Sequence, residues 1–155
     1  MKGDYARAAT VYEETLVLFQ ALEQPTGIAV TLHNLGHCVL RQGNPWRAMR
    51  LFQESLSLLR DLQEQYIVAT CLAGLGSACL ALDWPRRAIR LFGAVAAALS
   101  VLGTQLEPVD RVEYESARDS ARAALDPAAW DQEWTTGQKM TLEEALAYAL
   151  AVGPE

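Results

Sequence analysis

The residues best placed to do chemistry in this sequence are its two histidines. His33 and His37 lie four positions apart, so a helix would carry both imidazoles on one face, one turn apart. Two ring nitrogens at this spacing can bind one metal ion. However, Cys38 would point to another side of the helix, Asn34 stands where an HExxH motif has glutamate, and no third ligand is evident. We therefore interpret the pair as lining a surface, and we expect no metal and no cofactor.

Catalytic motifs are the next possibility, and the sequence contains none. Serine, histidine and acidic residues occur, but they form no nucleophile elbow, no GxxxxGK[ST] phosphate loop and no cluster with metal-ligand spacing. No helix-turn-helix is recognisable either. We expect no catalytic residue and no enzyme activity, so the predicted role is binding.

Aromatic and basic side chains form two further groups that a partner could use. Trp130 and Trp134 lie four apart and could form an aromatic ligand patch, although burial against the preceding helix is favoured. Trp46 and Trp84 occupy equivalent positions and are interpreted as structural. A basic stripe on the expected outer face comprises Arg47, Arg50, Arg86, Arg87 and Arg90. Pairing with side chains four residues away on the same helix, and ordinary solvation, are favoured over an acidic partner.

Composition and charge narrow the classes of partner. The chain of 155 residues carries 19 acidic against 13 basic residues, so it lacks the positive field that draws proteins to nucleic acid or anionic lipid. No apolar run approaches the length of a membrane span, and the first residues have no signal-peptide character. The three cysteines lie in apolar stretches without CxxC pairing, which is typical of a reducing compartment. We expect a cytoplasmic protein without direct nucleic-acid or membrane contacts.

The elements that position these side chains are helices. Apolar residues recur at steps of three and four, as in Val11, Tyr12, Leu16 and Phe19, and alternation typical of strands is absent. Proline and glycine mark the breaks, with Asn44 and Asp83 as plausible helix caps. Helices are predicted at about 4–22, 26–42, 45–63, 66–82, 85–102, 109–125, 127–136 and 142–152.

An internal repeat organises these helices. An offset of 40 residues aligns the segments that begin at Gly3, Gly43 and Asp83. The superposed positions include Ala8 with Ala48 and Ala88, Tyr12 with Phe52 and Phe92, and Gly36 with Gly76. Repeats of this length indicate a solenoid, in which each helix buries its apolar stripe against the next. The recurring small residues indicate places where two helices approach closely.

The repeated unit resembles the tetratricopeptide repeat. An LxxLG motif at Leu32–Gly36 and Leu72–Gly76 is followed seven residues later by glycine or aspartate, then by alanine five further on and an aromatic residue four after that. The segments that resemble full repeats are residues 29–62 and 69–102, although this unit has 40 residues rather than about 34. The resemblance implies an all-α, right-handed superhelix of antiparallel helix pairs with the LG helix on the inner side.

The same resemblance implies a concave groove for a protein or peptide partner. Its expected lining comprises Val30, His33, Asn34, His37, Arg41, Thr70, Ala73, Ser77 and Ala81. A solvated helix face without a partner is the alternative. The basic clamp of chaperone-binding family members is largely missing at these positions, so chaperone tails are not expected.

Nearly the whole chain also resembles the carboxy-terminal sensor regions of LuxR-like, MalT-like and SARP-type bacterial regulators. This similarity includes the tail from Ala121 onward. The chain length and the predicted helices indicate a single domain over 1–155, made of an unpaired outer helix at 4–22, repeats at 26–63 and 66–102, a helix at 109–125 and a capping region at 126–155. The unpaired first helix indicates either an end severed from a larger regulator or an end covered by a second copy.

These observations lead to one functional hypothesis and one alternative. The hypothesis is an interaction or sensing module of a signalling or transcriptional regulator, which binds a peptide, a protein or a small inducer on its concave face. The alternative is a structural scaffold or a homodimer formed through residues 4–22, with no separate ligand.

Overall fold

The computed structural model describes residues 2–154, and the described residues form eight α-helices and no strand. The helices are α1 (Lys2–Ala21), α2 (Pro25–Arg41), α3 (Pro45–Leu59), α4 (Gln65–Ala81), α5 (Pro85–Leu102), α6 (Pro108–Ala124), α7 (Pro127–Gln138) and α8 (Leu142–Ala151). None of the helices in this described part combines the length and hydropathy of a membrane span.

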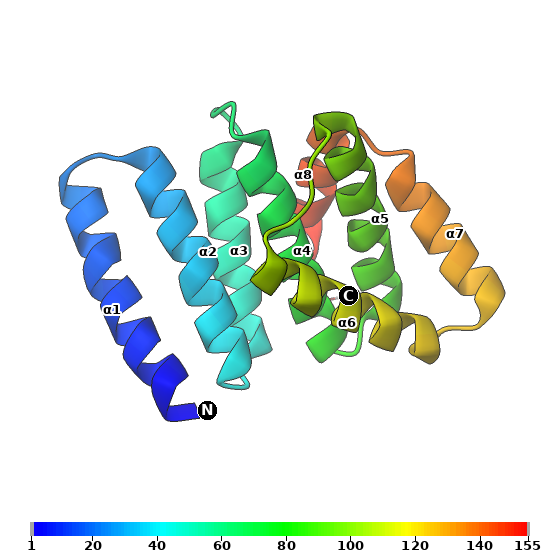
Figure 1. Ribbon diagram of the computed structural model, residues 1–155, viewed down its shortest axis with the longest axis horizontal. Helices are drawn as coiled ribbons and strands as arrows, with labels where there is room; N and C mark the ends of the chain where they lie inside the picture. Colours follow the sequence, from blue (N-terminus) through cyan, green and yellow to red (C-terminus); the bar gives the residue numbers. More distant parts are fainter. Residues whose placement is uncertain (1, 155) are drawn as a thin grey trace.

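The first five helices form an antiparallel stack in chain order, and α7 extends the stack beside α5 (Figure 1). The sixth helix leaves this order, because α6 crosses in front of α4 and α5 at a steep angle to both. The last helix, α8, returns to the opposite side and packs against α3, α4 and α5. The architecture is an all-α, tetratricopeptide-like solenoid, as predicted, with one helix laid across it.

Helix starts follow proline and capping residues. Five helices, α2, α3, α5, α6 and α7, begin with proline, whose missing N–H is not needed in a first turn. The side chains of Asn44 and Asp126 accept hydrogen bonds from backbone N–H groups three residues ahead, and Thr141 forms the expected capping box with Glu144.

Two local expectations are corrected. Asp83 does not cap α5, because it adopts a left-handed conformation with φ of 63° just after α4, the place that Gly43 takes after α2 with φ of 85°. The residue preceding α5 is Trp84, which makes no side-chain cap. In addition, α3 ends at Leu59 rather than near 63, since Leu62 N–H already donates to the Leu59 carbonyl in a tight turn.

The repeated glycines hold the repeated aromatic rings. An added Cβ at Gly36 would lie 2.8 Å from the ring of Phe52, and one at Gly74 would lie 2.5 Å from the same ring. Gly76 faces the ring of Phe92 in the same way. Both rings are fully buried. Each inner helix therefore carries a glycine that admits the aromatic residue of the next outer helix, which explains the spacing seen in the sequence.

The alanines at the helix crossings are too closely packed to be replaced by larger residues. Ala48 and Ala88 are both fully buried within the core. We predict that Ala48→Leu lowers the free energy of unfolding by roughly 1 to 3 kcal/mol, because the extra carbons overpack a filled crossing. Denaturant unfolding measures the loss. Ala128→Leu, on the exposed side of α7, is the control and should change stability by less than about 0.5 kcal/mol; equal effects at both sites would contradict the prediction.

Helix α4 is enclosed on every side. Its neighbours are α3, α5, α6 and α8, with α2 also in contact, and all residues from Val68 to Cys79 are buried. Such a helix cannot present an open groove. The C-terminal helix is fastened by Gln53 of α3, whose Nε2 donates to the carbonyls of Ala149 and Val152 at 2.9 and 2.7 Å.

Candidate functional site

Helix α6 of the same chain lies across the face of α2 and α4 where the sequence predicts a groove. Glu113 on α6 places Oε2 at 3.2 Å from Nδ1 of His37 and at 3.5 Å from Nη2 of Arg41, both on α2. On the other side of the same helix, the Tyr114 hydroxyl donates to the Phe92 carbonyl at 3.0 Å. Helix α6 thus contacts the inner helix α2 through charge and the outer helix α5 through a buried tyrosine.

This arrangement divides the predicted groove residues into three classes. Four are buried: His33, Thr70, Ala73 and Ser77. Asn34 and His37 are half-buried, and Val30, Arg41 and Ala81 remain exposed. The expectation that all nine line an open groove is therefore corrected. Thr70, Ala73 and Ser77 instead line a cavity of about 10 Å³ together with Asp110, Glu113 and Tyr114 of α6.

The two histidines meet beneath α6. Their ring centroids lie 4.6 Å apart at a steep angle, and both rings pack against Phe52 at 5.7 and 5.1 Å. Within the described residues, neither Nδ1 has a hydrogen-bond partner. The contact of His37 with Glu113 is close enough for a hydrogen bond but is not aligned for one, so we treat it as electrostatic.

Asp110 is the third group at this position. The ligand atoms of His33, His37 and Asp110 all lie within 4.8 Å of one another. Burial raises the pKa of the Asp110 carboxyl, whereas His37 and Arg41 hold the pKa of Glu113 below its usual value despite its burial. The sequence offered no third ligand near the histidine pair, and that expectation is corrected because α6 brings Asp110 to it from about 70 residues away.

We predict that stability falls between pH 7 and pH 5 because of His33. Burial, with His37 as the smaller cause, lowers the pKa of His33 from 6.5 to about 3. The ring is neutral in the fold, whereas in the unfolded chain it takes up a proton as the pH falls through about 6.5. At pH 5 this uptake favours the unfolded state by roughly 2 kcal/mol. Denaturant unfolding at both pH values should show that His33→Gln loses roughly 2 kcal/mol less than the wild type, and equal losses would contradict this.

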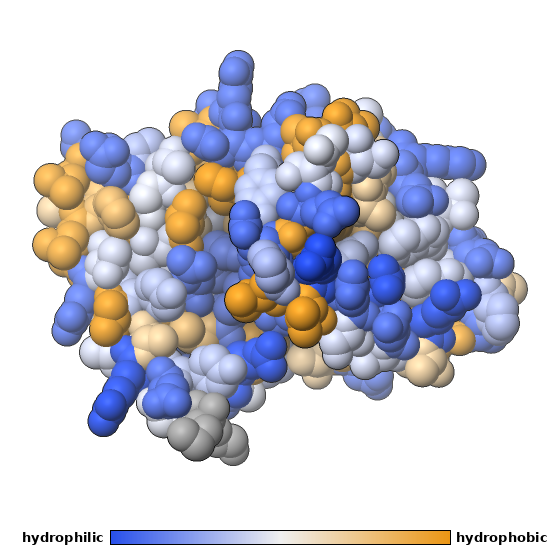
Figure 2. All heavy atoms as spheres, in the orientation of Figure 1, coloured by the Kyte–Doolittle hydropathy of each residue, from blue (hydrophilic) through white to orange (hydrophobic). Residues whose placement is uncertain are grey.

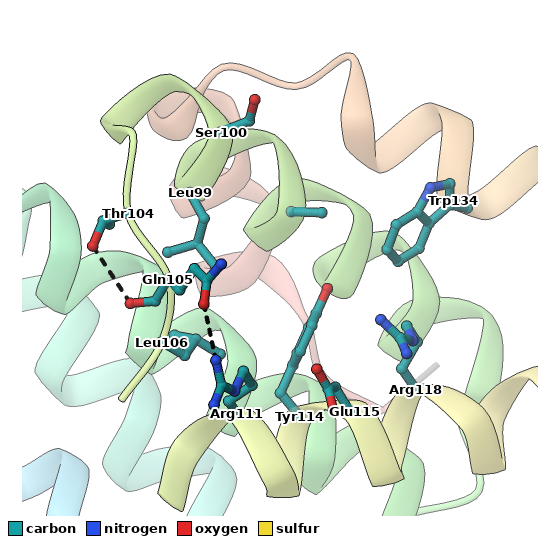
Figure 3. Close-up of a pocket in the computed structure, with 11 residues that line it drawn as sticks. Leu99, Ser100, Thr104, Gln105, Leu106, Arg111, Tyr114, Glu115, Arg118 and Trp134 are labelled. Carbon is teal, nitrogen blue, oxygen red and sulfur yellow. Dashed lines mark hydrogen bonds between the residues drawn. The ribbon is translucent and has the colours of Figure 1, made fainter. Parts of the chain in front are cut away.

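A second concavity lies on the far side of Tyr114. It has a volume of about 630 Å³ and opens between α5, α6, α7 and the segment that joins α5 to α6. Figure 3 shows Leu99, Leu106 and the Tyr114 ring at its floor, with Trp134 at one side and two arginines on α6. Arg111 Nη1 donates to Oε1 of Gln105 at 2.9 Å, which orients that guanidinium at the rim.

This pocket combines apolar and cationic walls. Arg118 lies over the Tyr114 ring at 5.8 Å, and Glu115 stands next to them on the same helix. Volumes of this size accommodate small organic ligands. The lining thus brings the rings of Tyr114 and Trp134 together with the guanidinium groups of Arg111 and Arg118 and the carboxylate of Glu115.

The repeat seen in the sequence is matched in the geometry, since α2 with α3 and α4 with α5 use the same glycine-to-aromatic contact. Residues 1–61 match the tetratricopeptide repeat family model. The match covers α1, α2 and α3. Tetratricopeptide repeats generally mediate protein–protein interaction and are generally non-catalytic. No curated protein and no solved structure matches the chain significantly.

The tryptophans occupy structural positions within the tetratricopeptide-like stack. Trp130 is buried and stacks on Trp134 with centroids 5.1 Å apart and 14° between planes. Trp134 also lines the 630 Å³ pocket, so its ring both packs on Trp130 and faces a space that a ligand could fill. Trp46 and Trp84 meet edge to face at 5.5 Å, which joins the starts of α3 and α5.

The basic stripe is largely paired inside the protein. Arg90 Nε donates to the buried Glu133 of α7 at 2.8 Å, and Arg86 lies 3.8 Å from the same carboxylate. Arg47 pairs with Glu13 of α1 at 3.0 Å. The predicted pairing between residues four apart is wrong for these three arginines, because their partners come from other helices. The contact of Arg90 with the buried Glu133 therefore joins α5 to α7, whereas the exposed Arg47–Glu13 pair contributes little to stability.

Proposed function

We propose that the chain is a protein-interaction module whose concave face binds a helix of a partner, at the place that α6 takes in this structure. The contact of α6 with both α2 and α5 carries the proposal, because it is a helix-in-groove complex formed within one chain. The partner segment would be amphipathic, with a buried aromatic residue beside an acidic one, as in Glu113 and Tyr114.

The small buried surface of α6 supports the idea that a partner helix can replace it. Only Tyr114 and Ala121 of this helix are buried, while Val109 and Val112 are exposed. A helix that buries two side chains gains less from packing than α4, which is enclosed throughout. Because α6 is tethered, its effective concentration at the groove is on the order of millimolar, so a partner must compete with it.

The groove residues named from the sequence belong to this proposal. With α6 displaced, Thr70, Ala73 and Ser77 would form a smooth floor of small side chains. Val30, Asn34, His37, Arg41, Ala81 and the deeper His33 would complete the binding face. The Arg41 guanidinium and the His37 ring would contact an acidic side chain of the partner, as they contact Glu113 in this structure.

We further propose that a small inducer controls this exchange in a bacterial signalling or transcriptional regulator. Tyr114 lines both the cavity against α2 and the 630 Å³ pocket, so a ligand in the pocket contacts the side chain that anchors α6. A ligand that binds the covered and uncovered states with different affinity shifts their populations. This setting rests on the resemblance to sensor regions inferred from the sequence alone, and the three buried free cysteines suit a reducing compartment such as the cytoplasm. The net charge of −6 argues against direct nucleic-acid binding.

A labelled peptide tests the groove. A peptide with the sequence of residues 107–125 is titrated by fluorescence anisotropy against the full chain and against the full chain carrying Tyr114→Ala. The variant is expected to bind the peptide at least about tenfold more tightly, because its own α6 competes less. Asp119→Ala, on the exposed side of α6, should bind it as weakly as the wild type does. Absence of binding to the Tyr114→Ala chain would reject the proposal.

One observation favours a different function, self-association through α1. Val11 and Leu18 are exposed on this helix and Leu22 is exposed just after its end, and hydrophobic residues gather at the edge of the molecule over α1 (Figure 2). The Phe19 ring is turned inward, toward Gly27 of α2, so it does not belong to this patch. A second copy could cover the patch and serve as a scaffold.

Sedimentation at increasing concentration tests self-association. A dimer that forms in the wild type should be lost in Leu18→Glu, because a charge in a dry interface is costly. Val101→Glu, also exposed but on α5, is the control and should still dimerise. A wild type that stays monomeric over the whole range would rule this function out.

A further inference from the structure

We propose that His33, His37 and Asp110 bind a divalent transition-metal ion of the zinc type, which links α2 to α6. The three side chains come from two helices that are far apart in the sequence, and their ligand atoms lie within 4.8 Å of one another. This inference does not rest on the proposed function, because the three ligands already come together with α6 in place, and displacement of α6 would instead take Asp110 out of the site.

The geometry suits one small ion. The histidines occupy positions i and i+4 of α2, so their rings project from one face. Four-coordinate zinc holds its ligand atoms about 3.3 Å apart, so side-chain movements of about 1 Å would close the cluster. The adjoining cavity of about 10 Å³, lined by His37, Asp110 and Glu113, offers space of about the size of one water molecule or one ion.

The buried and unpartnered His33 points independently to a ligand. Its side chain is 6% exposed, and its Nδ1 has no hydrogen-bond partner among the described residues. An unsatisfied buried polar atom costs roughly 1 to 3 kcal/mol, so such atoms are uncommon in folded proteins. Among the described residues His37 Nδ1 also makes no aligned hydrogen bond, although Glu113 Oε2 lies 3.2 Å from it. A metal ion would satisfy atoms that protein groups leave unsatisfied.

The donor set indicates the class of metal. Two imidazoles and one carboxylate suit zinc, iron, copper, nickel and related ions, whereas magnesium and calcium prefer oxygen ligands only. Glu113 stands beside His37 at 3.2 Å and can serve either as a fourth ligand or as an acceptor that orients the ring. The surrounding carboxylates also balance the charge of a dication.

Cobalt(II) is the probe, because its visible ligand-field absorption reports bound nitrogen and oxygen ligands. The full chain is titrated with cobalt(II), and zinc(II) is then added to displace it. We expect saturable absorption with one ion per chain and a rise in melting temperature with zinc. No absorption and no shift in melting temperature would overturn the proposal.

Matched variants locate the ion. Asp110→Asn and His37→Gln preserve side-chain shape and should weaken cobalt binding by more than the ten- to a hundredfold that loss of an outer-shell partner typically costs. Asp119→Asn, exposed on the same helix, should bind cobalt as the wild type does. Because two separate ligands are tested and each variant's metal-free melting curve is recorded, misfolding of one does not decide the result. Unchanged affinity in both ligand variants, or a thiolate absorption band from Cys38, would reject the site.

Discussion

Gly137→Ala is expected to lower the free energy of unfolding by at least about 3 kcal/mol. The Cβ that this change adds would overlap the carbonyl oxygen of Arg90 and would lie 3.0 Å from the backbone nitrogen of Ala94. Both are main-chain atoms of α5, and a main chain cannot rotate away as a flexible side chain can. The helices α5 and α7 must therefore separate, or the new methyl group must be accommodated by bending one of them.

A reciprocal contact makes this crossing unusually intolerant. Gly93 of α5 faces the carbonyl oxygen of Trp134 in α7, where an added Cβ would lie 2.5 Å away. Two glycines thus bring the two backbones together from both sides. Separation of the helices would also loosen the contact of Arg90 with Glu133, whose carboxylate is buried.

Denaturant unfolding of Gly137→Ala and Gly3→Ala measures the effect. Gly3 also lies in a helix, α1, but an added Cβ there meets no atom within 4 Å. Since alanine is the better helix former, Gly3→Ala should be neutral or stabilising by up to about 1 kcal/mol. If the two substitutions change stability equally, the close approach of α5 and α7 is not the cause.

The solenoid could be predicted because its rules are local. The LxxLG motif and the aromatic residue sixteen positions after its glycine, as with Gly36 and Phe52, describe one contact that recurs in the next repeat. Helix starts were equally readable, because proline and a capping side chain act within one turn. The crossing of α5 with α7 through Gly93 and Gly137 has no counterpart in the first repeat. The residues around each glycine therefore give no sign that the two meet.

The path of α6 could not be predicted from the same rules. Periodicity predicts that residues 109–125 form a helix, but it does not determine the direction in which that helix leaves the stack. One signal was available in α4, which lacks a charged face and places Thr70, Ala73 and Ser77 where an open groove would meet water. A helix that is apolar or small on all sides is normally buried on all sides. The groove on α2 and α4 stays a prediction, and the sequence analysis missed that α6 lies over this face.

The candidate site shows the same division. The pairing of His33 and His37 follows from helix geometry, so it was visible in the sequence. The contributions of Asp110 and Glu113 depend on where α6 crosses, which is a tertiary property. Chemistry on this face therefore depends on the position of α6, and any event that moves this helix changes both the groove and the histidine cluster.

Tyr114→Ala is expected to release α6 from the stack. The substitution removes a ring that packs against Phe92 at 5.3 Å and a hydroxyl that donates to the Phe92 carbonyl at 3.0 Å. Truncation of a buried aromatic residue costs roughly 3 to 5 kcal/mol. The only other buried side chain of α6 is that of Ala121, so the remaining packing is small. The loss should therefore appear as local opening of α6 rather than as unfolding of the whole stack.

Trypsin detects this opening, because Arg111, Arg118 and Arg122 all lie on α6. In Tyr114→Ala we expect cleavage after these arginines to be faster by at least about tenfold, while sites in α3 and α5 stay protected. Tyr114→Phe keeps the ring and loses one hydrogen bond, so it should open much less, with a cost of about 1 kcal/mol. Faster cleavage throughout the chain would mean that Tyr114 stabilises the whole fold, whereas unchanged cleavage would mean that charge contacts alone hold α6. Selective cleavage, together with tighter binding of the α6 peptide, would identify Tyr114 as the residue that keeps the groove covered.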